Sequence, residues 1–221
     1  MVRMNRRHQP RRLTHSQAVV ILAAGHSSRM KRPKLLLAWD KTSVLGHQIR
    51  TWQALGARQI AIVCAAGDDG VRAELDRLGF PTSDRILNVR SEDGMFSSIR
   101  CAAQWDDWLP GLTHWAITLG DQPHLRLETL RAVLKLSASK PGQVCQPRRL
   151  GHLRHPVVLP KKFFLGLKDS SAATLKEFLR PFAEEIASCE VDDPGLDLDI
   201  DVPEDYERAR ALSRGAKEKR G

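Results

Sequence analysis

Apolar and polar positions along the chain follow two different periods. Continuous apolar runs, which are typical of strands buried on both faces of a parallel sheet, fall at 17–23, 59–64, 85–89 and 114–119. Between these runs, apolar residues recur every three or four positions, as on one face of a helix, over 43–56, 69–79, 95–106 and 126–138. The first half of the chain is therefore predicted to alternate strand and helix.

The second half continues the pattern less regularly. It predicts strands at 143–147 and 154–159, two helices within 161–180, and a last helix from residue 203. Single helices between strands predict an α/β fold, a three-layer α/β/α sandwich with a Rossmann-like, mostly parallel sheet and right-handed crossovers. In such sheets a ligand binds beyond the carboxyl ends of the strands, here the segments after residues 23, 64, 89 and 119.

The net charge of the 221-residue chain is +9, and it is unevenly distributed. Residues 1–16 carry five arginines and no acid, and residues 214–221 carry four basic residues against one acid. We therefore predict a single domain over 17–213 between two basic, disordered tails. Because the excess charge lies in the tails, nucleic acid is not the expected partner, although binding through the tails is the alternative.

Cysteine spacing and hydropathy narrow the class of protein further. The four cysteines are widely spaced and form no CxxC pair, which argues against a zinc ribbon and against a disulfide scaffold. The apolar run at 18–24 is far shorter than a membrane span, and no long apolar segment follows the basic start as in a signal peptide. We expect a cytoplasmic protein with no membrane partner.

The segment "AAGHSSRMKRPK", which follows the first predicted strand, is dense in cations and hydrogen-bond donors. Its spacing is that of neither a P-loop nor a GxGxxG fingerprint. Gly25 allows a ligand to approach the backbone closely, and Ser27 and Ser28 offer hydroxyl donors. Arg29 suits two phosphate oxygens at once, and Lys34 supplies a point charge. The pattern indicates an anion-binding loop, with a solvated basic loop as the alternative.

Two acidic stretches are candidates for a metal site. Asp121 follows the predicted strand at 114–119, where it either caps the next turn or binds Mg²⁺. Farther along, three acidic residues alternate with three apolar ones, which in an extended strand would place all three carboxylates on one face: Leu196, Asp197, Leu198, Asp199, Ile200 and Asp201. Such a row indicates a cation or solvent opposite it.

Five blocks of sequence, in this order, resemble one known family. They are "LAAGHSSRMKRPKLLLAW", "GMFSSIR", "LGDQP", "RHPVVLP" and "DIDVPEDY". Together they are similar to the MobA-like NTP transferases, and within these to the molybdenum cofactor (molybdopterin) cytidylyltransferases. The resemblance covers residues 17 to about 212. It implies the fold of the nucleotide-diphospho-sugar transferases.

The resemblance also implies roles for individual residues. Lys34, Arg29 and Asp121 would be catalytic. The residues expected to bind the nucleotide are Leu22, Ala23, Ala24, Gly25, Ser27, Ser28, Arg29, Lys34, Asn88, Gly94 and Ser97. Ser98 and His155 are expected on the acceptor side. Mg²⁺ would bind Asp121 together with Asp199 or Asp201, with Asp199 slightly favoured.

The implied reaction transfers NMP from an NTP, with CTP favoured, to a phosphorylated acceptor such as molybdopterin, and releases pyrophosphate. The sequence departs from the family pattern in two places that bear on this reaction. Lys31 stands where the family has Gly, and "KDSSAATLKEF" replaces the usual Gly-Asp-x-Gly-Ala-Arg, so that an arginine expected to contact the acceptor is lost. The alternatives are a sugar-phosphate or other small phosphate acceptor, or a non-catalytic chaperone that binds nucleotide or molybdenum cofactor.

Overall fold

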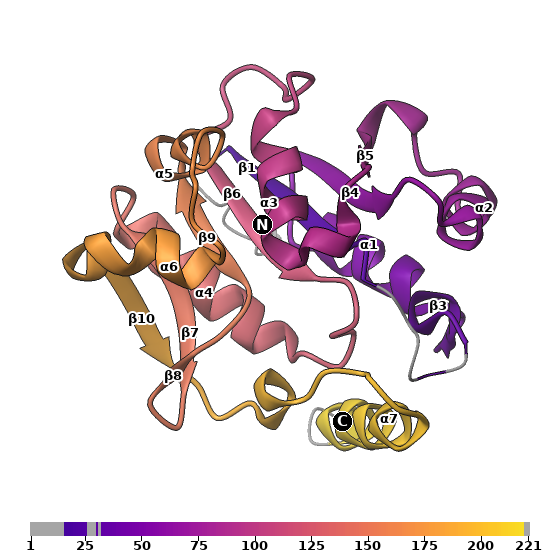
Figure 1. The fold of residues 1–221 in the computed structure, drawn as a ribbon. Coiled ribbons are helices and arrows are strands. Elements are labelled where there is room, and N and C mark those ends of the chain that lie inside the picture. The colour runs from indigo at the N-terminus through magenta and orange to yellow at the C-terminus, as the bar shows by residue number, and fades with distance from the viewer. Residues whose placement is uncertain (1–15, 26–29, 31, 219–221) are drawn as a thin grey trace, which may run out of the picture.

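A computed structural model describes residues 16–25, 30 and 32–218 of the chain (Figure 1). The main sheet has the strand order β10-β7-β9-β6-β1-β4-β5, with β8 paired to β7. Its strands are β1 (Gln17–Ala23), β4 (Gln59–Ala65), β5 (Arg85–Asn88), β6 (His114–Leu119), β7 (Val144–Arg149), β8 (His152–Leu153), β9 (Val157–Pro160) and β10 (Ile186–Glu190). A separate ribbon pairs β2 (Ala38–Trp39) with β3 (Thr42–Ser43).

Helices connect most of these strands. The α-helices are α1 (Val44–Ala54), α2 (Asp69–Arg77), α3 (Met95–Gln104), α4 (Leu127–Ser139), α5 (Lys161–Gly166), α6 (Leu175–Leu179) and α7 (Pro203–Glu218). Short 3₁₀ helices are η1 (Lys34–Leu36), η2 (Thr82–Asp84), η3 (Ser91–Asp93), η4 (Arg180–Glu185) and η5 (Pro194–Asp197). Within the described residues, no helix is long and apolar enough to cross a membrane.

The core lies on both faces of the sheet because the inner strands β1, β4 and β6 are apolar at most positions, so that both of their faces are apolar. In β1, Val19 and Ile21 pack with apolar residues of α1, α2, α4 and α7. The alternate residues Val20 and Leu22 pack with α3 and α5 on the other face. The result is a three-layer arrangement with the sheet in the middle (Figure 1), and the predicted fold class is confirmed.

The directions of the strands show which edge of the sheet is the candidate ligand-binding edge. β1 pairs in parallel with both β4 and β6, and β4 pairs in parallel with β5. Only β8 and β9 run against their neighbours in the described sheet, so the sheet is mixed but mostly parallel. The chain runs from β1 outward through β4 and β5 and then returns to the other side of β1 as β6. The loops after β1 and β6 therefore lie next to each other, at the switch point where α/β sheets bind ligands.

Two local predictions are wrong, and one strand was missed. The segment 196–201 is not a strand, because η5 occupies its start and no ladder partner follows. The strand β10 was not predicted, since its sequence "IASCE" has no strong alternation of apolar and polar residues. Finally, α7 continues to Glu218, so that residues 214–218, predicted as part of a disordered C-terminal tail, are helical.

Candidate active site

The first side of the site is the end of β1. Leu22, Ala23, Ala24 and Gly25 line a cavity of about 430 Å³ at the carboxyl edge of the sheet. Their backbone is positioned by the parallel ladders on both sides of β1. Three predicted ligand-binding residues, Ser27, Ser28 and Arg29, lie outside the described residues, as does Lys31.

Lys34 connects the first loop to both acidic stretches. Its ammonium group donates a hydrogen bond to the carboxylate of Asp121 and another, 3.3 Å long, to Oδ1 of Asp201. Burial opposes the charge on Lys34, but these two carboxylates outweigh it, so the pKa of the ammonium is raised above its ordinary value. Lys34 therefore stays charged in the site at neutral pH.

Gly120 explains how Asp121 comes so close to the first loop. The N–H of Gly120 donates to the carbonyl of Leu22 over 3.0 Å, which ties the end of β6 to the end of β1. A Cβ atom at position 120 would lie 2.7 Å from that carbonyl oxygen, a distance that side chains do not tolerate. The absence of a side chain at Gly120 thus lets Asp121 enter the cavity.

The C-terminal acidic segment contributes two of its three carboxylates. Asp199 and Asp201 line the cavity, whereas Asp197 turns away and forms ion pairs with Arg149 and Arg154. Burial and then the nearby charge of Asp121 raise the pKa of the Asp199 carboxyl, and a 2.8 Å hydrogen bond from Gln122 partly offsets this effect. Asp199 and Asp121 are therefore neighbouring like charges.

A buried clasp, which the sequence analysis missed, holds this segment against the loop after β6. Nε2 of His124 lies 3.1 Å from the carbonyl oxygen of Gly195 and 3.0 Å from that of Leu198, so it carries the proton and donates to both. The buried carboxylate of Asp193 accepts hydrogen bonds from Thr129 Oγ1, Arg126 N and Gly195 N. The sequence "DDPG", with Asp before Pro-Gly, is a turn signal that points to such a cap.

The loop between β5 and α3 forms the opposite wall. The buried amide of Asn88 donates to the hydroxyls of Ser97 (2.7 Å) and Ser98 (3.0 Å) and accepts from the N–H of Arg90. Gly94 and Ser98 line the 430 Å³ cavity, whereas Asn88 and Ser97 hold the loop in shape. Ser98, predicted on the acceptor side, thus lies in the same cavity as Lys34.

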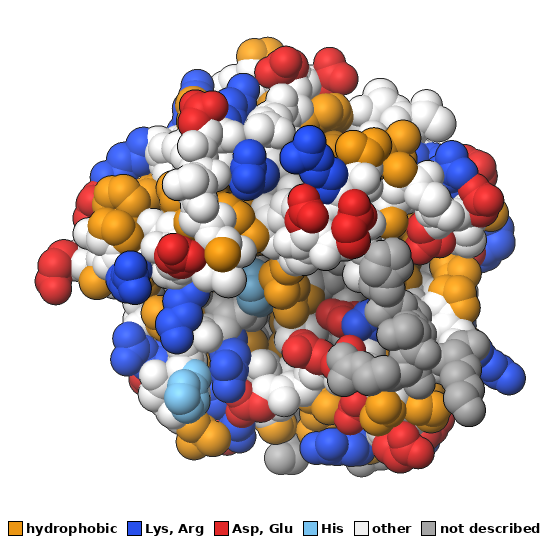
Figure 2. Space-filling model, in the orientation of Figure 1, with side chains coloured by type: hydrophobic (Ala, Val, Ile, Leu, Met, Phe, Trp, Pro, Cys, Tyr) orange, Lys and Arg blue, Asp and Glu red, His pale blue; other side chains and the backbone are white. Residues whose placement is uncertain are grey.

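We call this space the acidic cavity. Among its described lining residues, one cation faces four carboxylates: Lys34 against Glu92, Asp121, Asp199 and Asp201. Figure 2 shows acidic and basic side chains together in a hollow on this face of the molecule. A smaller cavity of about 320 Å³ shares Ala24, Gly25 and Ser91 with it and extends to Ala65 and Gly67 after β4.

A second cavity of about 800 Å³ lies over β7, β8 and α6, and we call it the basic cavity. Its charged lining residues are Arg148, Arg154, Lys176 and Arg180 against Glu177. His155 lines it too, and its Nδ1 lies 3.3 Å from the carbonyl oxygen of Ile117. Burial lowers the pKa of the His155 imidazole, and the charges of Asp199 and Asp121 oppose this shift. Among the residues that line the basic cavity, His155 is therefore one whose imidazole is influenced by the carboxylates of the acidic cavity.

The sequence matches the MobA-like NTP transferase domain over residues 19–187, most of the chain. The chain belongs to the MobA-like NTP transferase family. It is therefore a member of a nucleotidyltransferase family, and the resemblance predicted from the five sequence blocks is confirmed.

Curated relatives of this MobA-like transferase differ in how much of their length it covers. The molybdenum cofactor cytidylyltransferase of Escherichia coli (strain K12) is 24% identical over 197 residues, which are 86% of this chain and 94% of that protein. The bifunctional protein GlmU of Corynebacterium diphtheriae is 30% identical over 135 residues, 59% of this chain but 27% of GlmU. The chain thus spans about a quarter of the length of the GlmU proteins it matches.

Solved structures share the fold of this MobA-like transferase. A nucleotidyl transferase from Methanothermobacter has a TM-score of 0.72 at 18% identity, covering 90% of this chain and 99% of that one. A manganese complex of Rv0371c from Mycobacterium tuberculosis H37Rv has a TM-score of 0.63 at 24% identity over 88% and 97%. The CTP complex of a CMP:2-keto-3-deoxy-manno-octonic acid synthetase reaches 0.69 at 15% identity over 90% and 99%.

The Rv0371c structure named above is a manganese complex, and the carboxylates of the acidic cavity fit a divalent metal. Among the described residues no three His, Cys, Asp or Glu side chains are gathered as a ready metal site. Mg²⁺ suits this arrangement, because it takes one or two carboxylates and fills its other positions with phosphate oxygens and water. Asp121 and Asp199 line the same cavity, and the charge of Asp121 helps to raise the pKa of the Asp199 carboxyl, an effect that a cation near both carboxylates would oppose.

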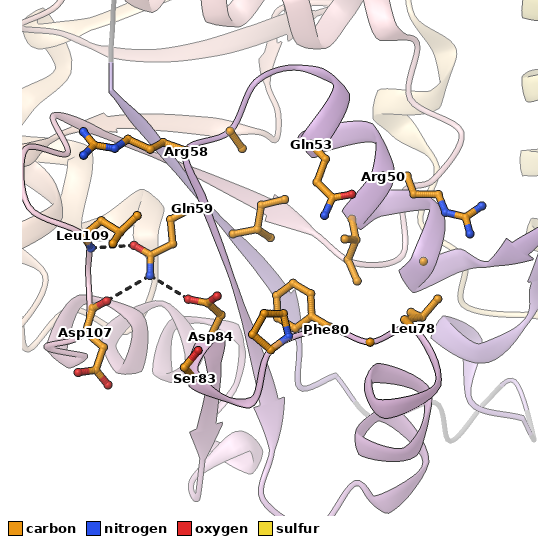
Figure 3. A pocket seen from close by; sticks show the side chains of 16 residues that line it. Arg50, Gln53, Arg58, Gln59, Leu78, Phe80, Ser83, Asp84, Asp107 and Leu109 are labelled. Carbon is orange, nitrogen blue, oxygen red and sulfur yellow. Dashed lines mark hydrogen bonds between the residues drawn. The ribbon is translucent and has the colours of Figure 1, made fainter.

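A third cavity of this MobA-like transferase, about 530 Å³, lies at the opposite edge of the sheet, where β4 begins (Figure 3). Its central polar group is already satisfied: the amide of Gln59 donates to Asp84 and to the carbonyl of Asp107, and accepts from the N–H of Leu109. Its other labelled residues include two arginines at the rim and the apolar Leu78 and Phe80. The polar side chain at the centre of this cavity therefore links neighbouring loops, and we assign no reaction to the cavity.

Proposed function

We propose that this enzyme transfers an NMP group, CMP by preference, from an NTP·Mg²⁺ complex to a phosphorylated acceptor and releases pyrophosphate. The observation that carries the proposal is the position of Lys34. Its ammonium lies between Asp121 and Asp201 in a cavity at the carboxyl edge of a MobA-like transferase sheet. An amine held charged there is suited to a triphosphate.

In the proposed reaction, an oxygen of the acceptor phosphate attacks the α-phosphorus of the NTP. The bond from that phosphorus to the oxygen bridging to the β-phosphate breaks, and pyrophosphate leaves with the electron pair. A phosphate monoester is largely ionised at neutral pH, so the attack requires no general base from the protein. Lys34, and Arg29 by family resemblance, would offset the charge that develops on the α-phosphate.

Mg²⁺, when bound, would neutralise phosphate charge and hold the reacting groups in line. We propose Asp121 and Asp199 as its protein ligands. Asp199 lines the cavity beside Asp121, whereas Asp201 is hydrogen-bonded to Lys34 and would hold that ammonium in place. The base and ribose would lie along Leu22–Gly25 and extend into the adjoining space next to Ala65 and Gly67.

The basic cavity is the proposed acceptor site. It is large enough for a cofactor-sized molecule, and its cationic lining suits a phosphorylated ligand. Nδ1 of His155 lies 3.3 Å from the carbonyl oxygen of Ile117 in β6, the strand that leads to Asp121, so an acceptor phosphate near His155 would approach the reacting centre. Molybdopterin is the favoured acceptor because the Escherichia coli relative that matches along nearly its whole length is a molybdenum cofactor cytidylyltransferase.

The decisive experiment measures pyrophosphate release from each of the four common NTPs with Mg²⁺, with and without molybdopterin. We expect release that requires both CTP and molybdopterin. Release with a sugar phosphate but not with molybdopterin would replace the acceptor and keep the reaction class. Binding of CTP or molybdopterin without any release would identify a chaperone and overturn the proposed transfer.

A further inference from the structure

The four cations of the basic cavity fall into two classes. Arg154 is paired with Asp197 at 2.8 Å, and Arg148 lies 3.6 Å from Glu190 and donates to Ser188. Lys176 and Arg180, by contrast, form no ion pair with any acidic side chain in the described part of the chain. Two of the four cations therefore have an acidic partner in the described part of the protein, and two do not.

The helical backbone also places Lys176 and Arg180 close together. Lys176 lies in α6, and Arg180 follows its last residue in a right-handed helical conformation, four positions along. Side chains at this spacing share one helix face, and two like charges there repel. Leu175 and Leu179 of the same helix line the cavity beside them, so that an apolar surface adjoins the two charges.

The one acid of the cavity does not neutralise this pair. Thr174 caps α6 by accepting from the N–H of Glu177, and the Glu177 carboxylate accepts from the N–H of Ala173. Glu177 thus serves the start of the helix, where the helix dipole also favours a negative charge. This cap fixes α6 and keeps its two cations at the cavity.

We infer that Lys176 and Arg180 bind a second anionic group of the acceptor, a carboxylate, phosphate or oxyanion, separate from the phosphate that reacts. This inference rests on the proposed function for the identity of the cavity's ligand. The acceptor class is then a molecule with two separated anionic groups on an apolar body. The reacting phosphate lies at the His155 side, the body lies against Leu175 and Leu179, and the second anion lies at the Lys176–Arg180 pair.

The test uses two probes that differ by one charge: phenyl phosphate and para-carboxyphenyl phosphate. Their binding to the full-length protein is measured by calorimetry, with Mg²⁺ and a non-cleavable CTP analogue present. We expect the carboxylated probe to bind wild-type protein more tightly than phenyl phosphate. The double variant Lys176→Gln/Arg180→Gln should weaken the carboxylated probe about tenfold and change phenyl phosphate less than about twofold.

The chain offers a matched control for the loss of two positive charges. Arg131 and Lys135 are exposed on α4, four positions apart, and line none of the four cavities described above. The double variant Arg131→Gln/Lys135→Gln should leave both probes unaffected. Equal weakening in both double variants, equal wild-type affinity for the two probes, or no binding of either probe would overturn the inference.

Kinetics separate this inference from the proposed function. With an acceptor that supports pyrophosphate release, Lys176→Gln/Arg180→Gln should raise the acceptor KM about tenfold while kcat and the KM for the NTP stay unchanged. Normal release with an unchanged acceptor KM would refute the charge pair alone. Absence of release in wild-type protein that still distinguishes the two probes would refute the transfer reaction and leave the anion site standing.

Discussion

The acidic cavity presents four carboxylates and one ammonium among its described lining residues, whereas the basic cavity presents four cations and one carboxylate. Both are nevertheless proposed to bind anions, a triphosphate in the first and a phosphorylated acceptor in the second. The two cavities therefore require different solutions. A triphosphate cannot enter a carboxylate-rich site without added positive charge, but an acceptor can enter the basic cavity as a free anion.

The opposite charges that line the two cavities explain how one edge of the sheet could hold two anions close together. In the acidic cavity the protein would supply oxygen ligands and one amine, and most of the positive charge would arrive with the nucleotide as a metal complex. In the basic cavity the protein supplies the cations itself.

Chelation of divalent metal should consequently abolish nucleotide binding while leaving the anionic probes bound, which calorimetry with and without EDTA would show.

The largest expected effect follows from Asp121→Ala. This substitution removes a proposed metal ligand and one partner of Lys34, so pyrophosphate release should fall about a thousandfold or more. Binding of para-carboxyphenyl phosphate in the basic cavity should be unchanged. Asp169→Ala, which removes an exposed carboxylate outside both cavities, is the control and should retain full turnover. Near-normal release by Asp121→Ala would disprove the metal role.

Substitutions of Asp199 and Asp201 should affect turnover in different ways. Asp199→Asn is expected to lower turnover about a hundredfold at limiting Mg²⁺, and added Mg²⁺ should restore much of it, because a ligand has been weakened. Asp201→Asn should lower kcat about tenfold at every Mg²⁺ concentration, since it removes one of the two negative charges that hold the Lys34 ammonium. Measurement of turnover against Mg²⁺ concentration decides the matter, and the reverse pattern would exchange the two roles.

The sequence analysis succeeded where the structure depends on local order. The strands β1, β4, β5 and β6 follow from their apolar runs, and parallel strands bring their carboxyl ends to one edge. Lys34 and Asp121 come just after two such neighbouring strands, so their proximity could be expected. The basic cavity could not be foreseen, because it combines residues of β7 and β8 with residues of α6, and the sequence pattern does not show that these segments lie together.

The acidic segment 196–201 shows that the alternation of apolar and polar residues predicts burial but not backbone conformation. The alternation of Leu196, Leu198 and Ile200 correctly predicts burial of all three, although the backbone is a 3₁₀ turn and coil instead of a strand. The carboxylates separate because Asp197 meets two arginines from β7 and the segment after β8, far away in sequence. Similarly, the clasp of His124 acts on backbone carbonyls, which leave no trace in the side-chain pattern.

Gly195→Ala tests whether the clasp serves the acidic cavity alone. A Cβ atom there would lie 2.8 Å from Cδ2 of His124, so the clasp must shift. We expect a loss of about 1–3 kcal/mol in the free energy of unfolding, with lower kcat and unchanged probe binding in the basic cavity. Gly142→Ala is the matched control, because a Cβ atom there meets nothing within 4 Å. Equal effects of the two substitutions would contradict a specific clasp.

The smallest expected effect is a pH dependence of stability that arises from His155. Burial lowers its pKa in the folded protein, so between the folded and unfolded pKa values the unfolded chain binds more protons. Stability should therefore be fully present above the ordinary histidine pKa and fall as the pH drops below it, by at most about 1.4 kcal/mol per pH unit for one histidine. Urea unfolding at about pH 7.5 and pH 5.5 measures this slope. His155→Gln should make the slope shallower, because the substituted side chain does not titrate. A slope equal to that of the wild type would mean that His155 takes up its proton in the folded protein, and the basic cavity would then gain a further positive charge in mild acid.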